Sequence, residues 1–188
     1  MPISVNCNLC GANETEFVTN KVRYDTKDSI VKCKKCGLVY MNPQPSEKEL
    51  REYYSKKYRD VYSSNKSPKE TFEDTLPEAN WRVNFLGNYF PKPKKVLDIG
   101  CSTGSFLYLL QKKGWEAYGT ELHEDYTKFA KKKIGQNIYT GTLNDANFKD
   151  NQFDAVTLFH VLEHFSDPFS SLIEIKRVLK KDGLLYLE

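Results

Sequence analysis

Residues 96–110 place an apolar run, a glycine-containing turn and a helical pattern in immediate succession. The sequence VLDIGCSTGSFLYLL has Asp98 near the end of the apolar run and Gly100 and Gly104 in the turn that follows. Small residues let the backbone turn tightly, and the N-terminus of the next helix then points its N–H groups into the crevice beyond the strand. The pattern therefore predicts an α/β fold with a ligand-binding turn at this point.

The acid before this turn narrows the class of ligand. In a dinucleotide-binding turn, a carboxylate beside the first glycine would repel the pyrophosphate, so Asp98 favours a positively charged ligand without phosphate. The next predicted strand, 115–120, is followed by Glu121, and a carboxylate at this place can accept hydrogen bonds from both ribose hydroxyls. The alternatives are a nicotinamide-binding Rossmann domain and a tight turn without a ligand.

Two more strands are predicted at 137–140 and 153–159, and the second is apolar almost throughout, as in a parallel strand buried on both faces. The sequence HVLEH follows it and holds two of the three histidines of the chain. Active sites of α/β proteins form at such strand ends, and an imidazole with a pKa of about 6.5 can act as a general base. The candidate catalytic residues are His164 as the base, Glu163 as the acid that orients it, and His160, and a structural role for the histidines is the alternative.

In this order, the motifs from residue 96 to residue 188 resemble class I S-adenosylmethionine (SAM)-dependent methyltransferases. The resemblance implies a Rossmann-like sheet, SAM as cofactor, and a loop at 141–145 that covers the adenine. Ser102 departs from the family, because many members have a glycine there, and Cys101 is expected to be a small buried residue of the turn. The implied cofactor-binding residues are Asp98, Gly100, Cys101, Ser102, Gly104, Glu121, Thr142, Leu143 and His160.

The N-terminal region contains two Cys-x-x-Cys pairs, each followed by glycine and separated by 22 residues. Two such turns let four thiolates converge in a tetrahedron, which predicts a structural zinc site of the ribbon type at Cys7, Cys10, Cys33 and Cys36. Two disulfides are one alternative, but we expect a cytoplasmic protein, whose thiols stay reduced. The other alternative is a redox-active pair, but a pair of that kind typically lies at the junction of a strand and a helix.

Three segments are expected: a zinc ribbon at 1–45, a helical lid or linker at 46–93, and a SAM-binding domain at 94–188. Ser46 and Glu49 form a capping-box pattern at the start of the second segment. The helix that it opens contains several tyrosines, whose spacing is typical of packing or of an aromatic lid over the SAM pocket. They are Tyr53, Tyr54, Tyr58 and, beyond the helix, Tyr62.

Charge and hydropathy exclude some classes of partner. The 28 basic and 25 acidic residues are too balanced to indicate nucleic acid, and the chain has no apolar run of about 18 residues that could span a membrane. The two Cys-x-x-Cys pairs with the segment from Cys33 to Pro45, joined to this core, resemble bacterial sugar C-methyltransferases, which implies a small-molecule acceptor such as a nucleotide-linked keto-sugar. The alternatives are an rRNA or tRNA methyltransferase and an inactive SAM-binding or zinc-mediated interaction module. The oligomeric state is left open.

The C-terminal region predicts an amphipathic helix at 168–181, with Phe169 and Ile175 on its apolar face, and a fifth strand at 184–188. The family completes its sheet with two further strands, and an apolar fifth strand at the sheet edge would expose unpaired backbone groups. We therefore expect the 188 residues to be part of a longer protein, able to bind SAM but weak as a methyltransferase.

Overall fold

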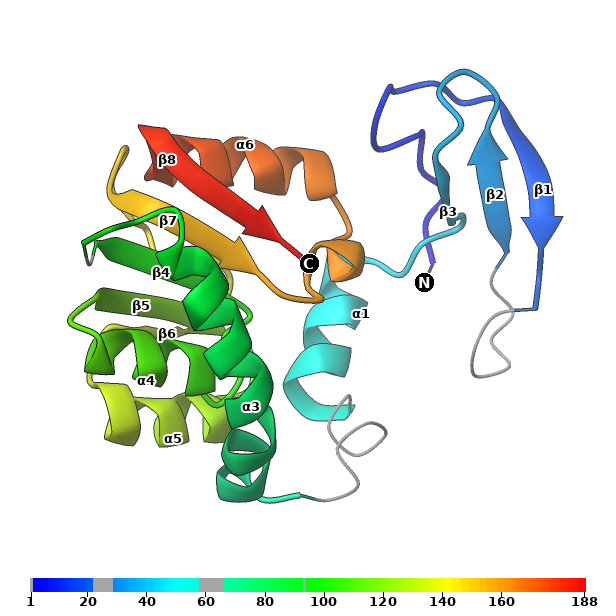
Figure 1. The fold of residues 1–188 in the computed structure, drawn as a ribbon. Coiled ribbons are helices and arrows are strands. Elements are labelled where there is room, and N and C mark those ends of the chain that lie inside the picture. The colour runs from blue at the N-terminus through cyan, green and yellow to red at the C-terminus, as the bar shows by residue number, and fades with distance from the viewer. Residues whose placement is uncertain (1, 22–28, 58–65, 93) are drawn as a thin grey trace.

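The computed structural model describes residues 2–21, 29–57, 66–92 and 94–188, and it contains a small N-terminal module and an α/β domain (Figure 1). The module is an antiparallel sheet of the strands β1 (Thr15–Thr19), β2 (Ile30–Cys33) and β3 (Val39–Met41), in that order. Two members of the predicted tyrosine cluster, Tyr58 and Tyr62, lie outside the described residues.

Within the described residues, the α/β domain has one sheet of five strands, and all its pairs are parallel. The order is β6-β5-β4-β7-β8, with β4 (Lys95–Ile99), β5 (Glu116–Glu121), β6 (Ile138–Thr140), β7 (Phe153–Leu158) and β8 (Leu179–Leu187). This arrangement confirms the predicted Rossmann-like fold. The chain order reverses between β4 and β7, and such a point opens a crevice beyond the carboxyl ends of the strands.

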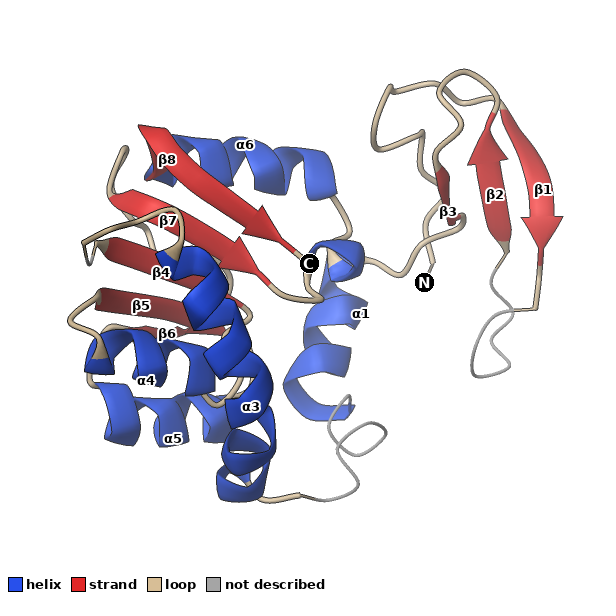
Figure 2. Ribbon diagram, viewed as in Figure 1, coloured by secondary structure: helices blue, strands red, loops and turns tan. Residues whose placement is uncertain are grey.

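Helices cover both faces of this sheet (Figure 2). One face packs against α3 (Pro68–Gly87), α4 (Ser105–Lys112) and α5 (Glu124–Ile134), and the other face packs against α6 (Pro168–Val178). The neighbouring residues Val96 and Leu97 of β4 are both fully buried, one in each of the two hydrophobic clusters. Burial on both faces explains why the strands read as nearly continuous apolar runs.

The second segment begins with the short helix α1 (Glu47–Glu52), which lies between the sheet and the N-terminal module in Figure 1. Its predicted capping box is confirmed, because the Glu49 N–H donates to Ser46 Oγ at 3.3 Å and the Ser46 N–H donates to the Glu49 carboxylate at 2.9 Å. The chain then continues as a π-helical turn, Tyr53–Lys57. A second capping box, at Ser67, opens α3.

The C-terminal helix is shorter than expected, and that prediction was wrong in two respects. Helix α6 ends at Val178 rather than at residue 181, because β8 begins at Leu179 and pairs with Phe153 of β7. The register then shifts, so that Ala155 faces Leu184, and the residues between form an irregularity in the strand. Phe169, expected on the apolar face, is 53% exposed.

Among the helices that the structure describes, none combines the length and the apolar character needed to cross a membrane.

Candidate functional site

The turn after β4 requires glycine at two positions for steric reasons. Gly100 and Gly104 have φ angles of +73° and +82°, which side chains rarely adopt. A Cβ atom on Gly100 would lie 2.5 Å from a methyl group of Val161, in the loop after β7. A Cβ atom on Gly104 would lie 2.5 Å from Ile134 of α5. The two glycines therefore let the turn approach the neighbouring loop and helix closely.

Glu121, at the end of β5, is held by this turn. One of its carboxylate oxygens accepts the Ser102 N–H at 3.0 Å and the other accepts the His123 N–H at 2.8 Å. Ser102 has a φ of +51°, so the family's glycine position is here a strained serine. Burial raises the pKa of Glu121. The carboxylate is thus fixed in place at the carboxyl end of the strand.

Asp98 and Cys101 lie behind the turn. The Asp98 carboxylate is 3% exposed and accepts a hydrogen bond from Thr157 Oγ1 at 2.7 Å. Burial raises the pKa of Asp98 to about 7, against the opposing effects of the Thr157 hydrogen bond and the Arg82 charge. Cys101 is buried against Gly119, where a Cβ atom would come within 2.6 Å of its sulfur, so the expected small buried residue is confirmed.

The raised pKa of Asp98 makes the stability of the ligand-free protein depend on pH. A carboxyl with a pKa of about 7 when folded and about 3.9 when unfolded holds a proton only in the folded state between these values. As the pH rises through this window, the free energy of unfolding should therefore fall by about 1.4 kcal/mol per pH unit, relative to an Asp98→Asn variant. Urea unfolding of both proteins at pH 5.5, 6.5 and 7.5 measures this difference, and parallel pH profiles would contradict it.

A cavity of about 670 Å³ lies beyond the carboxyl ends of the strands. It is bounded by the turn after β4, the end of β5, the loop at 141–144, the segment at 159–167 and one side of α1. The predicted site residues that line it are Gly100, Ser102, Glu121, Thr142, Leu143, His160 and His164. The predicted residues outside its lining, within the described part of the chain, are Asp98, Cys101, Gly104 and Glu163.

His164 is oriented by a residue of the N-terminal region. Its Nδ1 atom lies 2.9 Å from Tyr54 Oη, and the two ring centroids are 5.0 Å apart. The sequence suggested that Glu163 orients this imidazole, but the Glu163 side chain is exposed and contributes only its charge. Burial lowers the pKa of His164, and the His160 charge acts in the same direction while the Glu163 charge opposes it.

His160 stands at the mouth of the cavity in a left-handed conformation, with a φ of +54°. Its side chain is 65% exposed, and its Nε2 atom lies 3.4 Å from the Glu188 carboxylate. Arg82 donates to the same carboxylate at 2.8 Å and also to Glu78 at 2.9 Å. Among the described groups, His160 is therefore part of a charged network with α3 and the end of β8.

Helix α1 and the π-helical turn after it contribute residues to the cavity for which the sequence carried little signal. Arg51 forms an ion pair with Asp145, beside the loop at 141–144, and Tyr54 reaches the opposite side at His164. These partners are separated by 94 and 110 positions in the chain. No local pattern reports contacts of that range, although the tyrosine-rich helix had indicated a cover over the pocket.

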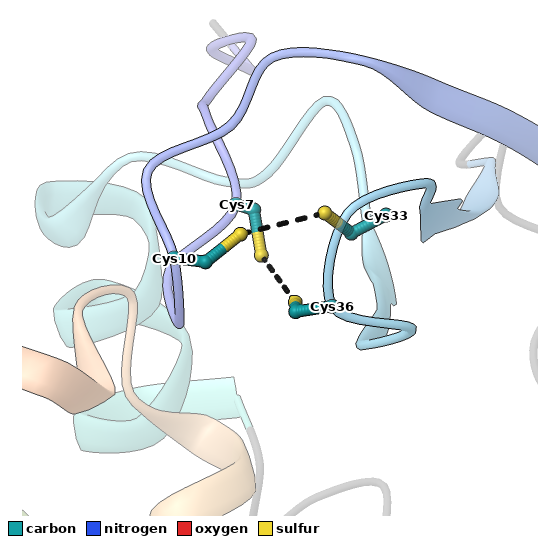
Figure 3. Close-up of side chains that lie close together, drawn as sticks. All are labelled: Cys7, Cys10, Cys33 and Cys36. Atoms are coloured by element: carbon teal, nitrogen blue, oxygen red, sulfur yellow. Dashed lines mark hydrogen bonds between the residues drawn. The ribbon is translucent and has the colours of Figure 1, made fainter.

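The four predicted cysteine ligands converge in the N-terminal module (Figure 3). The Cys7 and Cys36 sulfurs are 3.5 Å apart, those of Cys10 and Cys33 are 3.6 Å apart, and all four lie within 4.8 Å of one another. These separations far exceed a disulfide bond of about 2.05 Å. They match the roughly 3.8 Å edge of a sulfur tetrahedron with metal–sulfur bonds of about 2.3 Å.

Both cysteine turns have the same backbone pattern. In the first, Gly11 donates to the Cys7 carbonyl at 2.8 Å, and in the second, Gly37 donates to the Cys33 carbonyl at 2.9 Å. The two glycines have φ angles of +71° and +81°, as the sequence had suggested. Hydrogen bonding by the Cys36 backbone is the main effect that lowers the pKa of Cys33, to about 6. The second cysteine turn therefore favours a thiolate at Cys33.

Comparisons with known proteins find methyltransferases that are similar to this chain in sequence and in structure. Residues 97–187 match the family model described as a methyltransferase domain. Ubiquinone biosynthesis O-methyltransferase of Haemophilus ducreyi is 31% identical over 104 residues, covering 50% of this chain and 44% of that protein. Demethylmenaquinone methyltransferase of Thermotoga maritima is 33% identical over 98 residues, covering 50% and 43%.

A crystal structure of a SAM-dependent methyltransferase from Archaeoglobus fulgidus aligns with a TM-score of 0.51 and 27% identity, covering 62% of this chain and 54% of that one. The chain spans about half the length of the curated relatives it matches. The sheet order, the turn after β4 and the family match together identify residues 97–187 as a methyltransferase domain of the class I, SAM-dependent family.

Proposed function

We propose that this protein transfers a methyl group from SAM to a small-molecule acceptor. The observation that carries the proposal is that one cavity is lined both by Gly100, Ser102 and Glu121 and by Tyr54 and His164. The first set has the chemistry that a ribose and a methionine chain require. The second set offers an imidazole for proton transfer.

The residues that would hold SAM come from the ends of four strands, β4 to β7. Glu121 would accept hydrogen bonds from the ribose hydroxyls, and Leu143, with Thr142 beside it, would cover the adenine. The turn from Gly100 to Gly104 would accommodate the methionine portion through its backbone, with the Asp98 carboxyl behind it. His160, at the mouth of the cavity, would contact the exposed part of the cofactor. SAM supplies an electrophilic methyl group on a sulfonium.

The remaining task of the site is to place the acceptor atom in line with that methyl group. Positioning of this kind can contribute up to about 7–11 kcal/mol to the rate. An acceptor that must first lose a proton, such as a hydroxyl or a carbon beside a carbonyl, also needs a base. His164 is our candidate, because it lines the cavity and its lowered pKa keeps the imidazole neutral at pH 7.

The acceptor class is proposed from two sources. The names of the Haemophilus and Thermotoga relatives point to small phenolic or quinol acceptors, and the cysteine-containing N-terminal region favours a nucleotide-linked keto-sugar. Turnover of SAM with a quinol, a nucleotide-linked keto-sugar and a structured RNA separates these classes. Methylation of RNA alone would refute a small-molecule acceptor.

We also propose that Cys7, Cys10, Cys33 and Cys36 bind one structural zinc ion. The sulfur separations and the paired glycine turns support this assignment. A four-thiolate site has no open coordination position, so its zinc would stabilise the module and take no part in methyl transfer.

Replacing Glu121 with glutamine should weaken SAM binding by about 1.5–3 kcal/mol, because hydrogen bonds to a charged group have this magnitude. The amide would also set an N–H₂ group against the N–H of Ser102 or His123. Calorimetry with SAM measures the loss. Glu116→Gln, at the exposed opposite end of β5, is the matched control and should bind like the wild type. Equal affinities of the two variants, or tighter binding of NAD than of SAM, would refute the assignment.

A further inference from the structure

We propose that Tyr54 is the positioning residue of His164: its phenol oxygen accepts the Nδ1–H of the imidazole and thereby leaves Nε2 as the basic nitrogen. The inference deepens the proposed function, because it takes His164 as the base. It assigns to the N-terminal helical segment a part in the chemistry, beyond covering the cavity.

The geometry of the pair carries the proposal. Tyr54 Oη and His164 Nδ1 are 2.9 Å apart, a normal hydrogen-bond distance. The rings are in contact at 5.0 Å, tilted by 43°, and both side chains line the cavity. The pair is thus the meeting point of the π-helical turn after α1 and the short helical turn Leu162–His164 after β7.

Two contacts hold the helical segment that leads to Tyr54. The capping box at Ser46 fixes the start of α1, and the ion pair of Arg51 with Asp145 fixes the turn of helix before Tyr54. Arg51 and Tyr54 are three residues apart, which places them on the same side of the helical segment. The segment therefore bridges the loop at 141–144 and the segment that carries His164, with the cavity between them.

The direction of the hydrogen bond follows from what a base requires. A neutral imidazole carries one N–H, and the partner of one nitrogen decides where the proton resides. If Nδ1–H donates to the phenol oxygen, Nε2 has a lone pair for the acceptor proton, and the same bond persists in the imidazolium. The opposite arrangement, with the phenol donating, would place the proton on Nε2 and abolish its basicity. Burial and the His160 charge disfavour the imidazolium form of His164, and the Glu163 charge favours it. A phenol oxygen that accepts the Nδ1–H also stabilises the imidazolium, in the same direction as the Glu163 charge.

Nitrogen NMR of the imidazole rings tests the assignment on the 188-residue chain. The chain has three histidines, so His164→Gln identifies the His164 signals. In the wild type, we expect the neutral His164 ring to carry its proton on Nδ1. In Tyr54→Phe, the population should shift toward Nε2–H and the pKa of His164 should fall further. Tyr89→Phe is the matched control, because Tyr89 follows the end of α3 and is 56% exposed, and it should leave the His164 signals unchanged.

Two results would overturn the inference: a wild-type His164 whose proton is on Nε2, or a tautomer that stays the same in Tyr54→Phe. The signals of His123 and His160 report whether that variant is folded, and phenylalanine fills the same ring volume. The test does not depend on turnover. An Nδ1–H tautomer that needs Tyr54, in a protein without methyl-transfer activity, would support the inference and refute the proposed function. An active methyltransferase in which the His164 tautomer is the same with and without the Tyr54 hydroxyl would support the proposed function and refute the inference.

Discussion

Replacing Cys33 with serine should release the zinc ion and unfold the N-terminal module, while the five-stranded sheet stays folded. Cys33 is fully buried, and its sulfur is 3.6 Å from that of Cys10, so serine cannot complete the tetrahedron. Binding of structural zinc contributes on the order of 10–16 kcal/mol in small domains. The three short strands of the module have few apolar contacts that could replace it, since Phe17 and Val39 are exposed.

Elemental analysis of the purified protein measures the metal, and backbone NMR signals of β1–β3 report the fold of the module. Cys101→Ser is the matched control, because this cysteine is buried in the α/β domain and should leave one zinc per chain. The loss should also reach the cavity, because Asn8 in the first cysteine turn donates to the Ser166 carbonyl at 3.2 Å. A metal-free wild type with an intact module, or one with two disulfides, would contradict the zinc assignment.

Replacing His164 with glutamine should lower the rate of methyl transfer by roughly 10²–10⁴-fold, the usual contribution of a general base, while SAM affinity is kept. We expect the two effects to separate, because the proposed contacts with the ribose and the adenine are made by Glu121 and Leu143, which line the cavity from the ends of other strands. Single-turnover rates with the acceptor that the proposed turnover assay selects, and calorimetry with SAM, measure the two quantities separately.

The pH dependence gives a second readout for the same residue. Burial lowers the pKa of His164 below the usual value of about 6.5. The imidazole is neutral, and able to act as a base, at pH values above this lowered pKa. The rate of methyl transfer should therefore fall as the pH drops through it. His160→Gln is the comparison variant, because His160 is the alternative base on the same segment. A large loss in that variant with little change in His164→Gln would transfer the role to His160. Loss of SAM binding in His164→Gln would make His164 structural.

Much of the α/β domain followed from local sequence. The strands β4, β5, β6 and β7 were predicted within one or two residues of their bounds. Strands β4 and β7 are short apolar runs, and β5 and β6 are short segments bounded by glycine or polar residues. The cysteine cluster was also predictable, because ligand spacing within each Cys-x-x-Cys turn is a local property. The end of α6 was not, because pairing of β8 with β7 outweighed the helical pattern of residues 179–181.

The site divides in the same way. The sequence by itself determined the turn at Gly100 and Gly104 and the acid at the end of β5, because backbone conformation and strand direction impose them locally. Only the tertiary structure decided that Tyr54 meets His164, that Glu163 turns outward and that Arg51 closes the far side of the cavity. The contacts of Tyr54 and Arg51 join residues 94 or more positions apart. They depend on how α1 and the turn after it pack across the strand ends, which no local pattern encodes.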